Sequence, residues 1–246
     1  MTIITIIIYT VISIVLGMII RFSENKNIIN NICFKLMNHS KLEYNEIYVY
    51  VSTYIYWLLI IIFALLISFL QKQNILLYLH IDKEYIIYIF VNIFAVISSF
   101  EIIMSVLSLF NKNIKTNIVF NNILLVPSVD MLYSSRSNPK WILIILASII
   151  KCLFFNGVLY SAVKSELYNH HIFFTILIVG MLFSLEEIFR VNTIKQAIIF
   201  TSACFIVITM NSLTFEYSGS LIPPILANIA FTMYYFGQFE NIRRYT

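Results

Sequence analysis

Seven long apolar runs dominate the sequence and leave little room for any fold other than a helical membrane bundle. They cover residues 2–20, 48–70, 85–110, 141–163, 171–189, 196–213 and 219–236. A helix of about 20 residues crosses a hydrocarbon core of about 30 Å, because each residue adds about 1.5 Å. We therefore predict an all-α fold, a polytopic membrane bundle of about seven transmembrane helices.

The composition excludes an ordinary soluble domain. Of the 246 residues, 60% are hydrophobic and 11% are charged, whereas soluble domains average about 45–50% apolar and about 25% charged residues. The net charge of +4 is spread over the connections without a basic stripe, so we expect no nucleic-acid partner. The three cysteines lie far apart, which argues against a disulfide framework or a zinc ribbon.

Two segments need separate interpretation. The first run has neither a basic start nor a small-residue cleavage site, so we expect it to remain as a span. The segment 117–133 contains two asparagines, a proline and an aspartate, which favours a re-entrant or surface segment, with an eighth span as the alternative.

We divide the chain into an N-terminal transmembrane region, 1–135, and a second transmembrane region, 136–246.

The basic residues predict the orientation of the chain. If the N-terminus lies outside, the inner connections hold twelve Lys and Arg residues, and the outer connections hold only Lys72, Lys83 and Lys164. Inner loops are normally the basic ones. This asymmetry favours an odd number of spans in the cell membrane, with the N-terminus outside and the C-terminus in the cytoplasm.

Ionisable residues within the apolar runs are the first place to look for function in a membrane protein. Lys151 lies ten residues into the run that opens at Trp141, so it needs a carboxylate partner or must be neutral. Glu187 and Glu101 are the candidates. For Glu186 and Glu187, the competing interpretation is the solvated end of a helix.

Three stretches of the second region resemble known motifs in order: "KCLFFNGVLYSAV", "MLFSLEE" and "GSLIPPILANIAFTM". Together they resemble the CPBP family of intramembrane metalloproteases, also called the Abi or CAAX prenyl endopeptidase family, over roughly residues 140–236. The positions of the family's motifs EExxxR, FxxxH and HxxxN are occupied here by Lys151, Cys152, Asn156, Phe183, Glu187, Asn228 and Thr232.

These substitutions change the chemistry that the resemblance implies. In the family, glutamates and histidines are thought to hold a metal ion or to activate the water that attacks a peptide bond. A lysine repels a divalent cation, and Asn and Thr are weak ligands for a zinc-like ion. We therefore expect no intact catalytic residues, no metal site and no cofactor.

The resemblance implies a binding or scaffold protein, of the bacteriocin-immunity type, that has lost proteolytic activity. Its partners would be the lipid bilayer and a membrane protein or peptide. Separately, the bias of the sequence toward Ile, Asn and Lys suggests a bacterial source. One alternative is an active membrane metalloendopeptidase that uses Glu186 or Glu187 with Cys152 and a zinc-like ion. Another is a transporter or channel subunit in which Lys151, Glu101 and Glu187 line a polar path.

Overall fold

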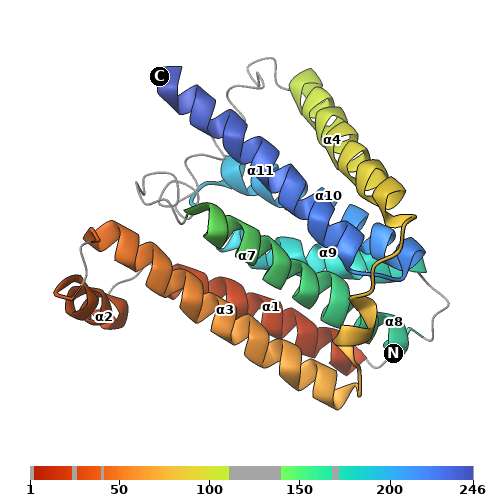
Figure 1. Ribbon diagram of the computed structural model, residues 1–246, viewed down its shortest axis with the longest axis horizontal. Coiled ribbons are helices and arrows are strands. Elements are labelled where there is room, and N and C mark those ends of the chain that lie inside the picture. The colour runs from red at the N-terminus through yellow and green to blue at the C-terminus, as the bar shows by residue number, and fades with distance from the viewer. Residues whose placement is uncertain (1–2, 24–26, 40–41, 111–139, 168–171, 246) are drawn as a thin grey trace.

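The computed structural model describes residues 3–23, 27–39, 42–110, 140–167 and 172–245 (Figure 1). Within these ranges all regular structure is helical, which confirms the predicted all-α class. The helices, labelled as in Figure 1, are α1 (Ile3–Ser23), α2 (Asn27–Met37), α3 (Tyr44–Leu70), η1 (Ile75–Tyr78), α4 (Tyr85–Phe110), α7 (Lys140–Cys152), η2 (Leu153–Leu159), α8 (Tyr160–Glu166), α9 (Ile172–Ile188), α10 (Ile194–Ser218) and α11 (Ile222–Tyr245).

Each of the seven apolar runs forms a helix in the structure. Within the described residues, four helical stretches are long and apolar enough to cross a membrane: Glu46–Leu70, Tyr85–Ile102, Trp141–Glu166 and Ile194–Ser218. The apolar parts of α1, α9 and α11 are shorter. These helices are consistent with a membrane protein. The segment 117–133 lies outside the described residues.

The fourth run is one continuous helix made of three parts, α7, η2 and α8. Its middle, η2, is a π-helix that begins two residues after Lys151. Such segments are rare and often occur at functional sites. Gly157 lies in η2 near the residue that precedes α11, where an added Cβ would be 2.9 Å from Leu221 Cδ1. A larger residue at this position would therefore displace the end of the Leu221 side chain.

The α7–α8 helix lies at the centre of the hydrophobic core. Phe154, Phe155 and Leu159 are fully buried, and they belong to one core cluster with Leu16 of α1 and Ile60 of α3. In contrast, large apolar side chains are exposed along the outer faces of α3 and α4. A soluble protein rarely exposes such continuous apolar surfaces. Lipid contact is the simplest account of these two faces.

The helices run back and forth between two ends of the bundle (Figure 1). Helix α1 begins at one end of the bundle, and α11 ends at the opposite end. Helix α4 lies at the edge of the bundle beside α11. Helix α2 lies in the connection between the first and second apolar runs. It packs on the start of α3 through a small cluster of Ile29, Cys33, Ile47 and Tyr48.

Candidate functional site

Lys151 and Glu187 form an ion pair inside the bundle. Lys151 projects from α7, and its Nζ donates a hydrogen bond to Oε1 of Glu187 near the end of α9. The Glu187 side chain is 1% exposed and that of Lys151 is 17% exposed. The structure thus brings together two residues that are 36 positions apart in the chain.

Arg190, in the turn after α9, adds a second cation. Its Nε lies 2.8 Å from Glu187 Oε2, and its terminal nitrogen Nη2 lies 3.2 Å from Glu186 Oε1. The Nε contact is an ion pair by distance, although its angle does not meet that of a hydrogen bond. Because Arg190 follows the two glutamates by three and four positions, one helical turn is enough to bring all three side chains together.

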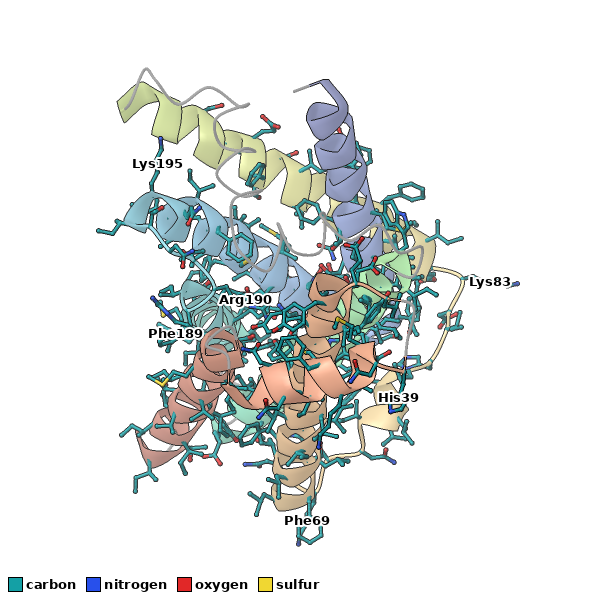
Figure 2. All side chains as sticks on the ribbon, turned by 90° about the vertical axis from the view of Figure 1, so that its left-hand side faces the viewer. His39, Phe69, Lys83, Phe189, Arg190 and Lys195 are labelled. Carbon is teal, nitrogen blue, oxygen red and sulfur yellow. The ribbon has the colours of Figure 1, made fainter. Side chains whose placement is uncertain are left out.

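Tyr56 of α3 completes the group. Its hydroxyl donates a hydrogen bond to Glu186 Oε1, and its ring centroid lies 5.7 Å from Lys151 Nζ and 5.0 Å from Arg190 Cζ. These distances allow cation–π attraction to both basic groups. Figure 2 shows Arg190 among the side chains in the middle of the bundle, whereas Phe69 and Lys83 project from its outside. We call the five residues Tyr56, Lys151, Glu186, Glu187 and Arg190 the charge cluster.

The charge cluster is electrically balanced, with two carboxylates facing two cations. A single ion in this environment would lose its hydration, at a cost of several kcal/mol, without a compensating partner. Glu186 and Glu187 are 0% and 1% exposed, so each depends on the neighbouring cations. Among the described residues, Glu186 Oε2 has no hydrogen-bond partner. The cluster is therefore close to, but not completely, satisfied.

Of the remaining motif positions, Phe183 lies beside this pair and the others do not converge on it. The Phe183 ring centroid is 5.2 Å from Lys151 Nζ, whereas Cys152 is buried in the apolar core. Asn156 faces α10, where its Nδ2 donates to Ile208 O at 3.1 Å and to Ser212 Oγ at 2.8 Å. It therefore serves packing between η2 and α10.

Asn228 and Thr232 of α11 lie next to a different residue of α7, Ser148. Asn228 Nδ2 is 3.5 Å from Ser148 O, and Ser148 Oγ is 3.5 Å from Thr232 Oγ1. These are long hydrogen bonds between two neighbouring helices. The seven motif positions thus fall into separate groups around the α7–α8 helix rather than into a single polar site.

Glu101, the other candidate partner of Lys151, lies on an exposed face of α4. Within the described part of the chain, the ion pairs of Lys151 include Glu187 and not Glu101. Tyr56 is a contributor that sequence reasoning did not single out, because nothing in the pattern of the third helix distinguishes it from the neighbouring tyrosines. Arg190 could have been assigned from its spacing to Glu186 and Glu187.

The arrangement has the properties of a structural ion-pair network. A hydrolytic metal centre needs several anionic or imidazole ligands and an open coordination position. Among the residues that the structure describes, no group of three or more His, Cys, Asp and Glu side chains could hold a metal ion. Both carboxylates of the charge cluster already contact cationic side chains.

The chain matches no protein-family model, and comparisons with curated proteins and with solved structures find no significant match. The fold and the site therefore define the protein by class alone. It is an all-helical protein with helices able to span a membrane and a buried charge cluster shared by three of its segments.

Proposed function

We propose that this protein is a seven-span membrane protein, similar to the CPBP family, that binds a peptide or membrane-protein partner without cleaving it. It acts as a scaffold or as a bacteriocin-immunity-type protein of a bacterial cell membrane. Its N-terminus lies outside and its C-terminus in the cytoplasm. Helices at all seven apolar runs and the basic inner connections support this topology.

The observation that carries the proposal is the ion pair between Lys151 and Glu187. Both residues stand at positions where the family motifs have ligands or bases, and here the ammonium occupies the space beside the carboxylate. A divalent ion would have to displace both Lys151 and Arg190 from Glu187. Hydrolysis by a metal-bound water is not supported by such a site.

The charge cluster gives the same residues a structural role. Tyr56, Lys151 and Glu187 come from three different helices, α3, α7 and α9. Their contacts fix how these helices pack near the inner end of the predicted span. A bundle held in this way can present a fixed surface to a partner without performing chemistry.

Metal analysis tests the loss of the catalytic centre. We would purify the full chain, soak it with Zn²⁺ or Co²⁺, remove free metal and measure the bound metal per chain. The expected result is no tightly bound metal in the parent chain, in Glu187→Gln or in Glu166→Gln, a matched control at the other end of the bundle. One bound metal ion per chain that disappears in Glu187→Gln would contradict the proposal.

A protection assay tests the binding role. The protein would be produced at graded levels in a bacterium that is sensitive to a panel of membrane-active bacteriocin peptides. A noncatalytic binder protects in proportion to its copy number, and the peptide is recovered intact. Recovery of cleaved peptide, or protection by far fewer protein copies than peptide molecules, would indicate the metalloendopeptidase alternative.

A further inference from the structure

One face of α4 carries an exposed stripe with the spacing of a helix-pairing seam. The stripe consists of Ile87, Val91, Phe94, Ser98, Glu101 and Ser105, all of which are exposed. Their separations alternate between four and three residues, as in the a and d positions of a coiled coil. We call these six residues the α4 stripe.

The other face of α4 is already occupied. It packs on α10 and α11, and Asn92, which is 1% exposed, donates a hydrogen bond to Asn211 of α10 at 2.7 Å. The α4 stripe therefore points away from the bundle, and Figure 1 shows α4 at the edge of the molecule. From Ile87 to Glu101 the stripe residues are exposed, and no other described element packs over them.

The inner half of the stripe is polar, unlike a face that meets only lipid. Ile87, Val91 and Phe94 make the outer half apolar, whereas the inner half consists of Ser98, Glu101 and Ser105. Glu101 follows Tyr85 by sixteen residues, which places it about 24 Å along a helix that crosses a core of about 30 Å. Its carboxylate has no hydrogen-bond or ion-pair partner among the described residues.

We propose that the α4 stripe binds a transmembrane helix of another protein or peptide that carries a Lys or Arg at the depth of Glu101. The apolar half supplies packing, and the small Ser98 allows close approach of a second helix. Glu101 supplies a charge that a cation on the partner would neutralise within the membrane. This inference rests on α4 crossing the bilayer, as in the proposed function, but not on the loss of proteolysis.

The charge of Glu101 favours a different protein over a second copy of this chain as the partner of the α4 stripe. A symmetric contact between two α4 stripes would bring the same residues of both copies together. Glu101 would then face Glu101, and two neighbouring carboxylates disfavour ionisation of each other. A cationic helix avoids this conflict, so we assign the stripe to a basic heterologous partner.

Two designed peptides test the inference. The full chain is reconstituted in vesicles of neutral phosphatidylcholine with a leucine-rich transmembrane peptide that has one Lys at the depth of Glu101, or Met at the same position. Binding is measured by energy transfer between labels on the two chains. We expect the Lys peptide to bind about tenfold more tightly than the Met peptide, and Glu101→Gln to abolish this preference.

The control is Glu84→Gln, which removes the same charge from the exposed turn before α4 and should leave the preference intact. Equal binding of both peptides, or a preference that survives Glu101→Gln, would overturn the inference. A dimer that strengthens in Glu101→Gln and excludes the Lys peptide would assign the stripe to a second copy instead.

Two further measurements separate folding and membrane placement from recognition. Because Glu101 is exposed, Glu101→Gln should melt at the same temperature as the parent chain, and a large loss of stability would contradict the assigned role. Ser98→Cys should resist a membrane-impermeant maleimide in intact vesicles. Rapid labelling above the background of the native cysteines would show that α4 is exposed to water and would overturn this inference. The proposed loss of the metal centre would be unaffected, because the metal analysis tests it separately.

Discussion

Two ion pairs on the same long helix show how position changes the role of a charge in this protein. Lys151 precedes the π-helical segment η2 and pairs with Glu187, which is 1% exposed. Lys164 of α8 lies beyond η2 and contacts Glu216 of α10 through both carboxylate oxygens, at 2.8 Å and 2.7 Å. Lys164 is 30% exposed and Glu216 is 14% exposed.

The two pairs differ in what surrounds them more than in their own geometry. Glu187 is shared with Arg190 and is 1% exposed, so water reaches its carboxylate very little. Its partner Lys151 lies against the rings of Tyr56 and Phe183. Glu216 accepts a further hydrogen bond from Tyr160 at 2.7 Å, but Lys164 remains partly in contact with solvent. Breaking a buried pair leaves an uncompensated ion, whereas breaking an exposed pair leaves a hydrated one. We therefore expect unequal consequences for stability.

The largest effect should come from Glu187→Gln. This change leaves Lys151 and Arg190 facing Glu186 alone, so the charge cluster gains an uncompensated positive charge. We expect a loss of about 3–5 kcal/mol in the free energy of unfolding, as for other broken buried ion pairs. Denaturant unfolding of the purified protein in mixed micelles measures it. A loss no larger than that of a surface substitution would show that the pair does not stabilise the fold.

Replacing both partners should restore much of this loss. In the double variant Lys151→Met with Glu187→Leu, neither ion remains, and Arg190 still pairs with Glu186. We expect the double variant to regain about 2–4 kcal/mol relative to Glu187→Gln, because apolar replacements of both partners are often neutral. The comparison with the single Lys151→Met and Glu187→Leu variants gives the coupling energy of the pair. Additive effects would mean that Lys151 and Glu187 act independently.

Tyr56→Phe isolates the contribution of α3 to the charge cluster. The variant keeps the aromatic ring beside Lys151 and Arg190 but removes the hydroxyl that donates to Glu186. A hydrogen bond to a charged group contributes about 1.5–3 kcal/mol, so we expect a loss of that size in the same unfolding assay. Tyr54→Phe, on an exposed tyrosine of the same helix, is the matched control and should change stability little.

The smallest effect should come from Lys164→Met at the other end of the helix. Partly exposed ion pairs contribute about 0–1 kcal/mol and weaken as salt is added. We expect a loss below about 1 kcal/mol that decreases further at high ionic strength, since salt screens exposed charges. If Lys164→Met costs as much as Glu187→Gln, exposure does not account for the difference between the two pairs.

The sequence identified part of the charge cluster because a lysine in the middle of an apolar run must have its charge compensated or lose it. Lys151 needs a carboxylate or must be neutral, and the sequence offered Glu187 and Glu101 as its candidate partners. Choosing among them required the rotation of each helix about its axis. Helix α7 turns Lys151 toward the end of α9, whereas α4 turns Glu101 out of the bundle.

The motif positions were harder to place from sequence. The resemblance to the family's motifs implied one polar site at the positions of Lys151, Cys152, Asn156, Glu187, Asn228 and Thr232. The structure distributes these residues around the α7–α8 helix, with Asn156 facing α10 and Asn228 facing Ser148. The π-helical turn at η2 changes which side of the helix Asn156 occupies, and no propensity rule locates such a turn.

The sequence by itself determined the helical class and the position of each apolar helix. The physical reason is that a backbone surrounded by apolar side chains and lipid must satisfy its hydrogen bonds within the segment. Only the tertiary structure decided which charges meet, because apolar helices can rotate and cross in many ways without changing their composition. The pairing of Lys151 with Glu187, the part played by Tyr56 and the outward face of Glu101 all depend on that packing.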